Sequence, residues 1–170
     1  TKLRVVATPG FRKAEVAPKH DDMNEGDHMN QAASYVGTIL YVMRGTRPDV
    51  AQAVGYLSRH LKKWTKRQDR ALHRLICYLN GTRLEGLMII IDMRANKEMT
   101  VIDFDAYVDS DHGVDDSWRS TSGWLTGFFT NANLAAISWA SKLQTAVAHS
   151  TPEAEYVAMG TMLQRSALME

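Results

Sequence analysis

The sequence is poor in cysteine and proline, with one cysteine, Cys77, and four prolines among its 170 residues. A single cysteine excludes an internal disulfide and favours an intracellular setting, because small secreted domains commonly rely on disulfides. Long apolar runs are also missing: the longest, Leu87–Ile91, has the length of a strand and is far shorter than the roughly 20 residues of a membrane span. No basic and then apolar leader opens the sequence, so we expect neither secretion nor contact with a membrane.

Charge of either sign is balanced overall but separated along the chain. The 20 Lys and Arg residues and 19 Asp and Glu residues give a formal net charge of +1. Residues 59–83 hold eight basic residues and one acid, whereas residues 84–117 hold nine acids and two bases. A basic segment followed by an acidic one suits phosphate binding beside metal binding. Two solvated surfaces would produce the same pattern.

The first half of the chain predicts an irregular arm followed by helices. Residues 1–29 contain two of the prolines and no sustained periodicity, which favours a segment that lies over something else. Apolar residues at intervals of three and four predict helices over residues 29–44, from residue 46 onward and over residues 65–81. This half is therefore expected to be helical.

Individual residues predict how these helices begin and pack. Thr46 is the expected N-cap of the second helix, and Thr65 with Gln68 has the spacing of a capping box at the start of the third. Gly37 lies within the first helix, where glycine costs roughly 1 kcal/mol relative to alanine, so close packing is expected there.

The second half predicts consecutive antiparallel strands and a final helix. Residues 87–92, 101–109, 123–129 and 135–141 have the composition of strands, and a helix is expected from residue 152 to at least residue 169. The predicted fold class is α+β. The residues of the last helix that we expect to pack on the sheet are Tyr156, Met159, Gly160 and Leu163.

Three carboxylates mark the two ends of this strand-and-helix region. The strand over residues 101–109 ends at Asp109 and Asp111, and Glu155 lies in the first turn of the last helix. Carboxylates on two elements can hold Mg²⁺ or Mn²⁺, and a pair of such ions roughly 3.5–4 Å apart can cleave a phosphodiester. Alternatively, the aspartates are simply solvated and the glutamate serves the helix dipole.

Several short motifs occur in a fixed order. In the second half they are Tyr107–Asp111, Arg119–Gly123, Ile137–Lys142 and Glu153–Tyr156; upstream they are Ala7–Pro9, Tyr35–Tyr41, Thr46–Asp49, Leu57–Arg59 and Tyr78–Thr82. Their order and spacing resemble those of copia-type LTR-retrotransposon Pol polyproteins. The later motifs resemble the start of the ribonuclease H domain, and the earlier ones the end of the reverse transcriptase and its connection.

The resemblance implies a domain organisation and a function. It divides the chain into an arm (1–29), a helical reverse-transcriptase connection segment (30–84) and a ribonuclease H-like domain (85–170) that stops before its third and fourth carboxylates. The parent protein would hydrolyse the RNA strand of RNA–DNA hybrids by two-metal catalysis, within a cytoplasmic particle or the nucleus.

The resemblance also assigns roles to residues. Asp109 and Glu155 match catalytic metal ligands, with Glu153 as an alternative to Glu155. Asp111 is added as a further metal ligand from its position near the strand end, not from the resemblance. The partners implied are an RNA–DNA hybrid or duplex and the rest of the Pol polyprotein. The residues expected to bind nucleic acid are Arg59, Lys62, Lys63, Lys66, Arg67, Arg70, Arg74, Trp118 and Arg119.

A rival interpretation treats the chain as a truncated or decayed element that is catalytically inactive and acts at most as a nucleic-acid-binding or structural module. With two of four carboxylates, its hold on Mg²⁺ or Mn²⁺ would be weak. The strand at residues 101–109 would then have an open edge, which predicts either self-association or marginal stability.

Overall fold

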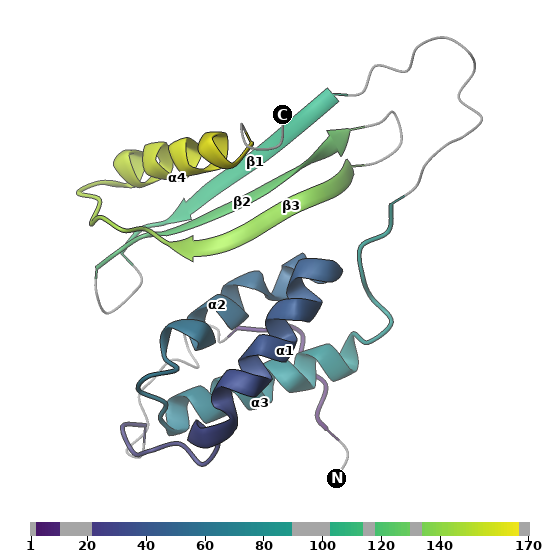
Figure 1. The fold of residues 1–170 in the computed structure, drawn as a ribbon, viewed down its shortest axis with the longest axis vertical. Coiled ribbons are helices and arrows are strands. Elements are labelled where there is room, and N and C mark those ends of the chain that lie inside the picture. The colour runs from purple at the N-terminus through teal and green to yellow at the C-terminus, as the bar shows by residue number, and fades with distance from the viewer. Residues whose placement is uncertain (1–2, 11–21, 90–102, 114–117, 130–133, 167–170) are drawn as a thin grey trace. The chain divides into compact units, whose positions relative to one another are not determined.

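The computed structural model describes residues 3–10, 22–89, 103–113, 118–129 and 134–166. Helices come first, then a three-stranded antiparallel sheet and a last helix (Figure 1), which confirms the predicted α+β class. The chain divides into two compact units, Thr1–Gly86 and Leu87–Glu170. Of the helices that the structure describes, none is both long enough and apolar enough to cross a membrane.

The first unit is a small helical bundle around a buried Trp64, which is 1% exposed. Val36 of α1, Leu57 of α2 and Leu75 of α3 are buried in the same unit. The amphipathic spacing of these apolar residues explains why each helix faces the core. Its elements are η2 (Met29–Gln31), α1 (Ala32–Gly45), η3 (Pro48–Val50), α2 (Ala51–Arg59) and α3 (Lys66–Gly81).

The helix starts and packing agree only in part with the sequence predictions. At the start of α3 the backbone N–H of Thr65 donates to Gln68 Oε1 at 3.1 Å, so this predicted cap is confirmed. The prediction for Thr46 is wrong: Thr46 follows the last residue of α1 and its N–H donates to the Val42 carbonyl, while η3 begins at Pro48. Close packing at Gly37 is also wrong, because Gly37 is exposed and its Cβ position meets no atom within 4 Å.

Arg47 joins the start of η3 to the end of α3. It is 5% exposed, and its guanidinium donates to both carboxylate oxygens of Asp49 and to the carbonyl of Thr82 at 2.9 Å. The Tyr78 hydroxyl donates to Asp49 as well, at 2.8 Å. Although burial opposes the charge, the hydrogen bonds from Arg47 and Tyr78 hold the pKa of Asp49 below its ordinary value. Within the Thr46–Asp49 motif, Arg47 and Asp49 thus have a structural role, connecting η3 to the end of α3.

The arm lies on α3, and Asp69 is the centre of the contact. Its carboxylate accepts the Trp64 indole N–H at 2.7 Å and the backbone N–H of Asp27 at 2.6 Å. The ring Nδ1 of His28 is 3.2 Å from the same carboxylate. Against the effect of burial, these hydrogen bonds hold the pKa of Asp69 below its ordinary value. The prediction that the arm lies over another part of the chain therefore holds for the described part of it.

The second unit is a sheet with the order β1-β2-β3, in which neighbouring strands are antiparallel (Figure 1). Its strands are β1 (Asp103–Asp111), β2 (Thr121–Phe129) and β3 (Leu134–Leu143). The strand predicted over residues 87–92 is wrong for residues 87–89, which have no regular structure, and its remainder lies outside the described residues.

The last helix, α4 (Thr151–Ser166), packs on β1 and β2 along one face of the sheet (Figure 1). Its buried residues are Ala154 and Ala158, both 0% exposed, and Met162. The predicted packing face is wrong: Tyr156 is 70% exposed and Leu163 is 57% exposed. The face of α4 that is buried thus consists of two alanines and Met162, while Tyr156 and Leu163 are exposed.

Candidate functional site

Asp109 and Glu155 line the same pocket, although they are 46 positions apart in the sequence. Asp109 comes from β1, opposite Gly123 of β2, and Glu155 comes from the first turns of α4. Both side chains belong to exposed residues. The pocket has a volume of about 430 Å³, and its other lining residues are Val108, Pro152, Tyr156 and Met159.

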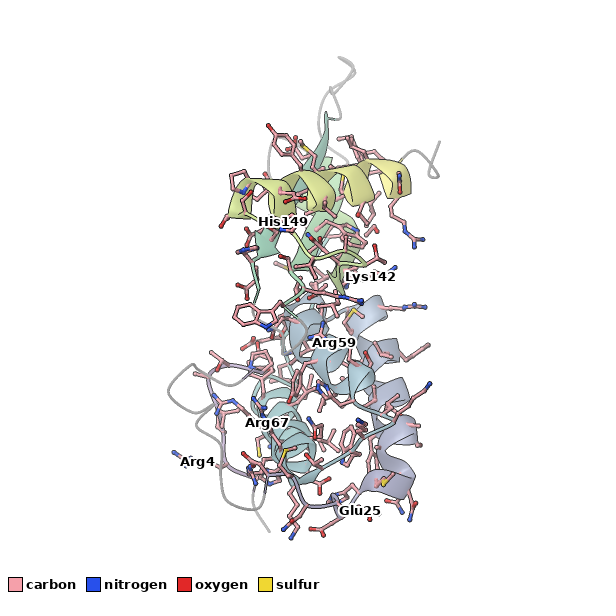
Figure 2. The ribbon with its side chains drawn as sticks, turned by 90° about the vertical axis from the view of Figure 1, so that its left-hand side faces the viewer. Arg4, Glu25, Arg59, Arg67, Lys142 and His149 are labelled. Carbon is pink, nitrogen blue, oxygen red and sulfur yellow. The ribbon has the colours of Figure 1, made fainter. Side chains whose placement is uncertain are left out.

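Glu153 has a different task from Glu155. The Glu153 carboxylate accepts the backbone N–H of His149 at 2.7 Å, and the Glu153 N–H donates to Ser150 Oγ at 3.3 Å. This reciprocal arrangement satisfies backbone groups at the start of α4, where His149 is labelled in Figure 2. Since Glu153 caps the helix and does not line the pocket, the geometry favours Glu155 as the partner of Asp109.

Asp111 lies two residues beyond Asp109, as the last residue of β1 and opposite Thr121. It is exposed and is not among the residues that line the pocket. Beside it, His112 Nδ1 is 3.1 Å from Ser120 Oγ, a contact that ties the end of β1 to the start of β2. The predicted role of Asp111 as a further metal ligand stays a prediction.

The number of nearby ligands limits what the pocket can hold. Within the described residues, no group of three or more His, Cys, Asp or Glu side chains is placed to hold a metal ion. Two carboxylates nevertheless suit one hydrated Mg²⁺, which takes oxygen ligands and commonly keeps several waters beside one or two carboxylates. The donor chemistry of Asp109 and Glu155 therefore fits a single hydrated divalent cation.

The second unit also has a buried polar contact that the sequence analysis did not single out. Gln144, directly after β3, is 5% exposed. Its side-chain Nε2 donates to Ser122 Oγ at 2.9 Å and to the Ala154 carbonyl at 2.8 Å. A glutamine closing an alternating strand is a weak signal, because most glutamines in that position are exposed.

Basic residues of the first unit gather around the end of α2 and the start of α3. Arg59 ends α2 and is exposed, as are Lys62 and Lys63 in the turn that follows. Lys66 and Arg67 belong to the first turn of α3 and are half-buried; Figure 2 labels Arg59 and Arg67.

Two further arginines of α3 are engaged by the arm. Arg70 forms an ion pair with Asp22. Arg74 donates through Nη2 to Thr8 Oγ1 at 2.9 Å and through Nε to the Thr8 carbonyl at 3.2 Å. These contacts give Arg70 and Arg74 a structural role in holding the arm, which nucleic-acid binding would have to share.

Trp118 and Arg119 lie just before β2. Trp118 is 74% exposed and has a φ of 58°, in the left-handed region that non-glycine residues seldom adopt. Arg119 is exposed as well. Exposed aromatic rings can stack on bases, and the nucleic-acid contact predicted for Trp118 and Arg119 stays a prediction.

Comparison with known proteins places the chain among transposon proteins. It is similar to the retrovirus-related Pol polyprotein from transposon TNT 1-94 of Nicotiana tabacum, with 39% identity over 127 residues, which is 74% of this chain and 9% of that protein. It is similar to the retrovirus-related Pol polyprotein from transposon RE1 of Arabidopsis thaliana, with 34% identity over 155 residues, 89% of this chain and 10% of that protein.

The chain matches a third relative over most of that relative's length. The secreted RxLR effector protein 161 of Plasmopara viticola is 39% identical over 134 residues, which is 78% of this chain and 87% of that protein. The chain belongs to one family with these proteins, the transposon Pol polyproteins among them. No protein-family model and no solved structure matches it.

Membership of this family confirms the predicted resemblance at the level of Pol polyproteins of transposons. The matched segment of this chain spans about a tenth of those Pol polyproteins, 9% of one and 10% of the other. The sequence is therefore transposon-derived. Because the relatives are much longer, any activity of theirs is only proposed for this chain.

Proposed function

We propose that the second unit is a ribonuclease H-like domain that binds a divalent cation between Asp109 and Glu155, within the reverse transcriptase and ribonuclease H region of a Pol polyprotein. The observation that supports this best is the shared pocket, which brings together Asp109, two residues before the end of β1, and Glu155, the fifth residue of α4 and so one turn further in than the sequence predicted. The order of elements, three antiparallel strands followed by a helix, agrees with the fold that the resemblance implies.

The pocket offers these carboxylates a favourable setting for a cation. Val108, Pro152 and Met159 line it together with Asp109 and Glu155, and both acidic residues are exposed, so a hydrated ion can reach them. When bound, Mg²⁺ or Mn²⁺ activates water and stabilises a leaving phosphate oxygen. The task of Asp109 and Glu155 is to hold that ion beside the scissile phosphodiester.

The substrate that the resemblance implies is an RNA–DNA hybrid. Exposed Arg59, Lys62 and Lys63 of the first unit would contact backbone phosphates, and Trp118 with Arg119 would contact the strands near the second unit. Binding through phosphates depends little on sequence and weakens steeply with salt. We propose that the chain acts inside the cell, in a cytoplasmic particle or the nucleus, together with the rest of the Pol polyprotein.

A non-catalytic module is the second candidate function. The observation in its favour is that the described residues offer two carboxylates at the pocket, whereas a pair of divalent ions needs more negative charge to bind tightly. This candidate retains hybrid binding and lacks turnover. For the 170-residue chain we expect this outcome.

A labelled RNA–DNA hybrid tests both candidates. We expect Asp109→Asn and Glu155→Gln each to weaken Mn²⁺ binding at least tenfold, by removing a direct ligand, while hybrid binding in the absence of metal is kept. Glu153→Gln is the matched control, since Glu153 caps α4, and it should bind Mn²⁺ like the wild type.

The readouts are Mn²⁺ titration, hybrid binding at several salt concentrations and Mg²⁺-dependent cleavage. Cleavage that disappears in Asp109→Asn supports the nuclease, and binding without cleavage supports the non-catalytic module. If Glu153→Gln weakens Mn²⁺ binding as much as Glu155→Gln, the assignment of ligands is wrong.

A further inference from the structure

Gln144 is a buried polar residue outside the candidate pocket. Its backbone N–H donates to the Ser120 carbonyl at 2.8 Å, which extends the pairing of β2 and β3 by one step beyond Leu143. With its main chain held in this way, the side chain of Gln144 starts from a fixed point on the sheet. It is directed to β2 and α4, because its Nε2 donates to Ser122 and to Ala154.

Both N–H donors of the carboxamide are used in these contacts. One bond, of 2.9 Å, ends on Ser122 Oγ, and the other, of 2.8 Å, ends on the Ala154 carbonyl. A carboxamide NH₂ has two hydrogens, so Gln144 spans the gap between sheet and helix with no donor left over. Ala154 is 0% exposed, and its carbonyl is therefore bonded in a dry environment, where hydrogen bonds are electrostatically stronger.

The two acceptors lie next to the two candidate ligands. The Ala154 carbonyl belongs to the same planar peptide group as the Glu155 backbone nitrogen, so holding one fixes the other. Ser122 precedes Gly123, which is the partner of Asp109 in the ladder between β1 and β2. One side chain therefore connects the backbone that carries Glu155 to the strand that pairs with Asp109.

Stability alone does not explain a glutamine at this position. Its Oε1 is buried and has no hydrogen-bond partner among the described protein groups. An unpaired buried acceptor is unfavourable, and methionine fills a similar volume without one. The glutamine thus carries an energetic cost that a purely structural contact between β3 and α4 would not require.

We propose that Gln144 is a positioning residue, which sets the place of Glu155 opposite Asp109 and so determines the affinity of the pocket for a divalent cation. This inference rests on the proposed function. Gln144 does not line the pocket, so its effect acts through the first turn of α4. Outer residues that orient metal ligands typically change metal affinity by about 10–100-fold.

The test uses the full 170-residue chain, Mn²⁺ as the probe and three variants. Gln144→Met removes both donors at similar volume, and Ser122→Ala removes one acceptor. Gln164→Met, at an exposed glutamine of α4, is the matched control. Mn²⁺ affinity is measured by titration well below the melting temperature, and amide hydrogen exchange is measured along α4 and α3.

We expect Gln144→Met to fold with a lower melting temperature, because the buried Ser122 hydroxyl loses its partner, and to bind Mn²⁺ about tenfold or more weakly. Amides in the first turns of α4 should exchange faster, while those of α3 are unchanged. Ser122→Ala should show a smaller effect in the same direction, and it decides the question if Gln144→Met does not fold. Gln164→Met should match the wild type in every readout.

Two results would overturn the proposal. One is a folded Gln144→Met that binds Mn²⁺ within about twofold of the wild type; the other is equal loss of affinity in Gln164→Met. If the wild type binds no Mn²⁺, the proposed cation site is wrong. Hydrogen exchange then tests on its own whether Gln144 holds the backbone that carries Glu155. Faster exchange confined to α4 in Gln144→Met supports the positioning of Glu155, and unchanged exchange refutes it.

Discussion

Gly26 lies where the arm crosses the start of α3, at a place with no room for a side chain. A Cβ atom there would be 2.5 Å from Trp64 Cδ1 and 2.9 Å from the Thr65 carbonyl oxygen. We expect Gly26→Ala to lower the free energy of unfolding by about 1–3 kcal/mol, because the arm must shift away from the buried indole. Chemical denaturation at neutral pH measures this change.

Gly37 supplies the opposite case on α1 and serves as the control. It is exposed, and an added Cβ would meet nothing within 4 Å. Gly37→Ala should therefore raise the free energy of unfolding by about 0.4–1 kcal/mol, through the lower entropy of the unfolded chain. A loss of stability in this variant similar to that of Gly26→Ala would contradict the packing described for the two positions.

At the scale of elements, the attachment of the arm to α3 depends on the charge of Asp69. Its folded-state pKa is held below the ordinary value of 3.8, mainly by hydrogen bonds that outweigh the effect of burial. A depressed carboxyl pKa gives stability that is fully present above about pH 4 and is lost as the pH falls through the folded-state value. The arm and α3 should separate from each other most readily in acid.

Asp69→Asn tests this contribution. At about pH 7 we expect a loss of roughly 1.5–3 kcal/mol in the free energy of unfolding, the range for hydrogen bonds to charged groups. The gap from the wild type should shrink as the pH falls below about 4 towards the folded-state pKa of Asp69, because the contribution of the carboxylate is lost over that range. Urea denaturation across this pH range measures the free energy of unfolding of the wild type and of Asp69→Asn.

Asp27→Asn is the control for that experiment. Asp27 is an exposed neighbour on the arm that contributes its backbone N–H, not its side chain, to the Asp69 contact. It should stay within about 0.5 kcal/mol of the wild type at every pH. A gap for Asp69→Asn that does not change with pH would show that lost packing, not lost charge, is responsible.

Local signals predicted the elements better than their packing. The capping box at Thr65 and the strands β2 and β3 are encoded by neighbouring residues, and the structure confirms them. The face of α4 was predicted wrongly, because the most apolar residues are not the ones that are buried. Ala154, Ala158 and Met162 are buried instead, at intervals of four residues that the larger apolar residues of α4 concealed in the sequence.

In the candidate site, too, the sequence predicted the residues better than the contacts between them. Alternation in β1 and the opening of α4 identified Asp109 and Glu155 from the sequence, and the structure places both at one pocket. The contact of Gln144 with Ser122 and Ala154 was not predicted, since it joins residues 22 and 10 positions apart through side-chain geometry alone. Composition and periodicity carry no information about such a contact.

At the scale of the whole molecule, the sheet of the second unit has β1 at one edge and β3 at the other among the described strands. An edge strand with unpaired backbone groups is a template for another chain. Lysine is a common protection of such edges, and β3 carries the exposed Lys142 near its end. The described β1 has exposed Phe104 and Tyr107 and no lysine, so β1 is the edge that we expect to pair.

We expect two copies of the chain to associate through β1, and more strongly at high salt. The strand carries four aspartates, Asp103, Asp105, Asp109 and Asp111, which repel those of a second copy until ions screen them. Ala106→Lys, at an exposed position of β1, should abolish the association, and Ile137→Lys on β3 should not. Sedimentation velocity over a range of concentrations and salt measures both. A chain that stays monomeric throughout, or a loss of association only in Ile137→Lys, would show that β1 is not the pairing edge.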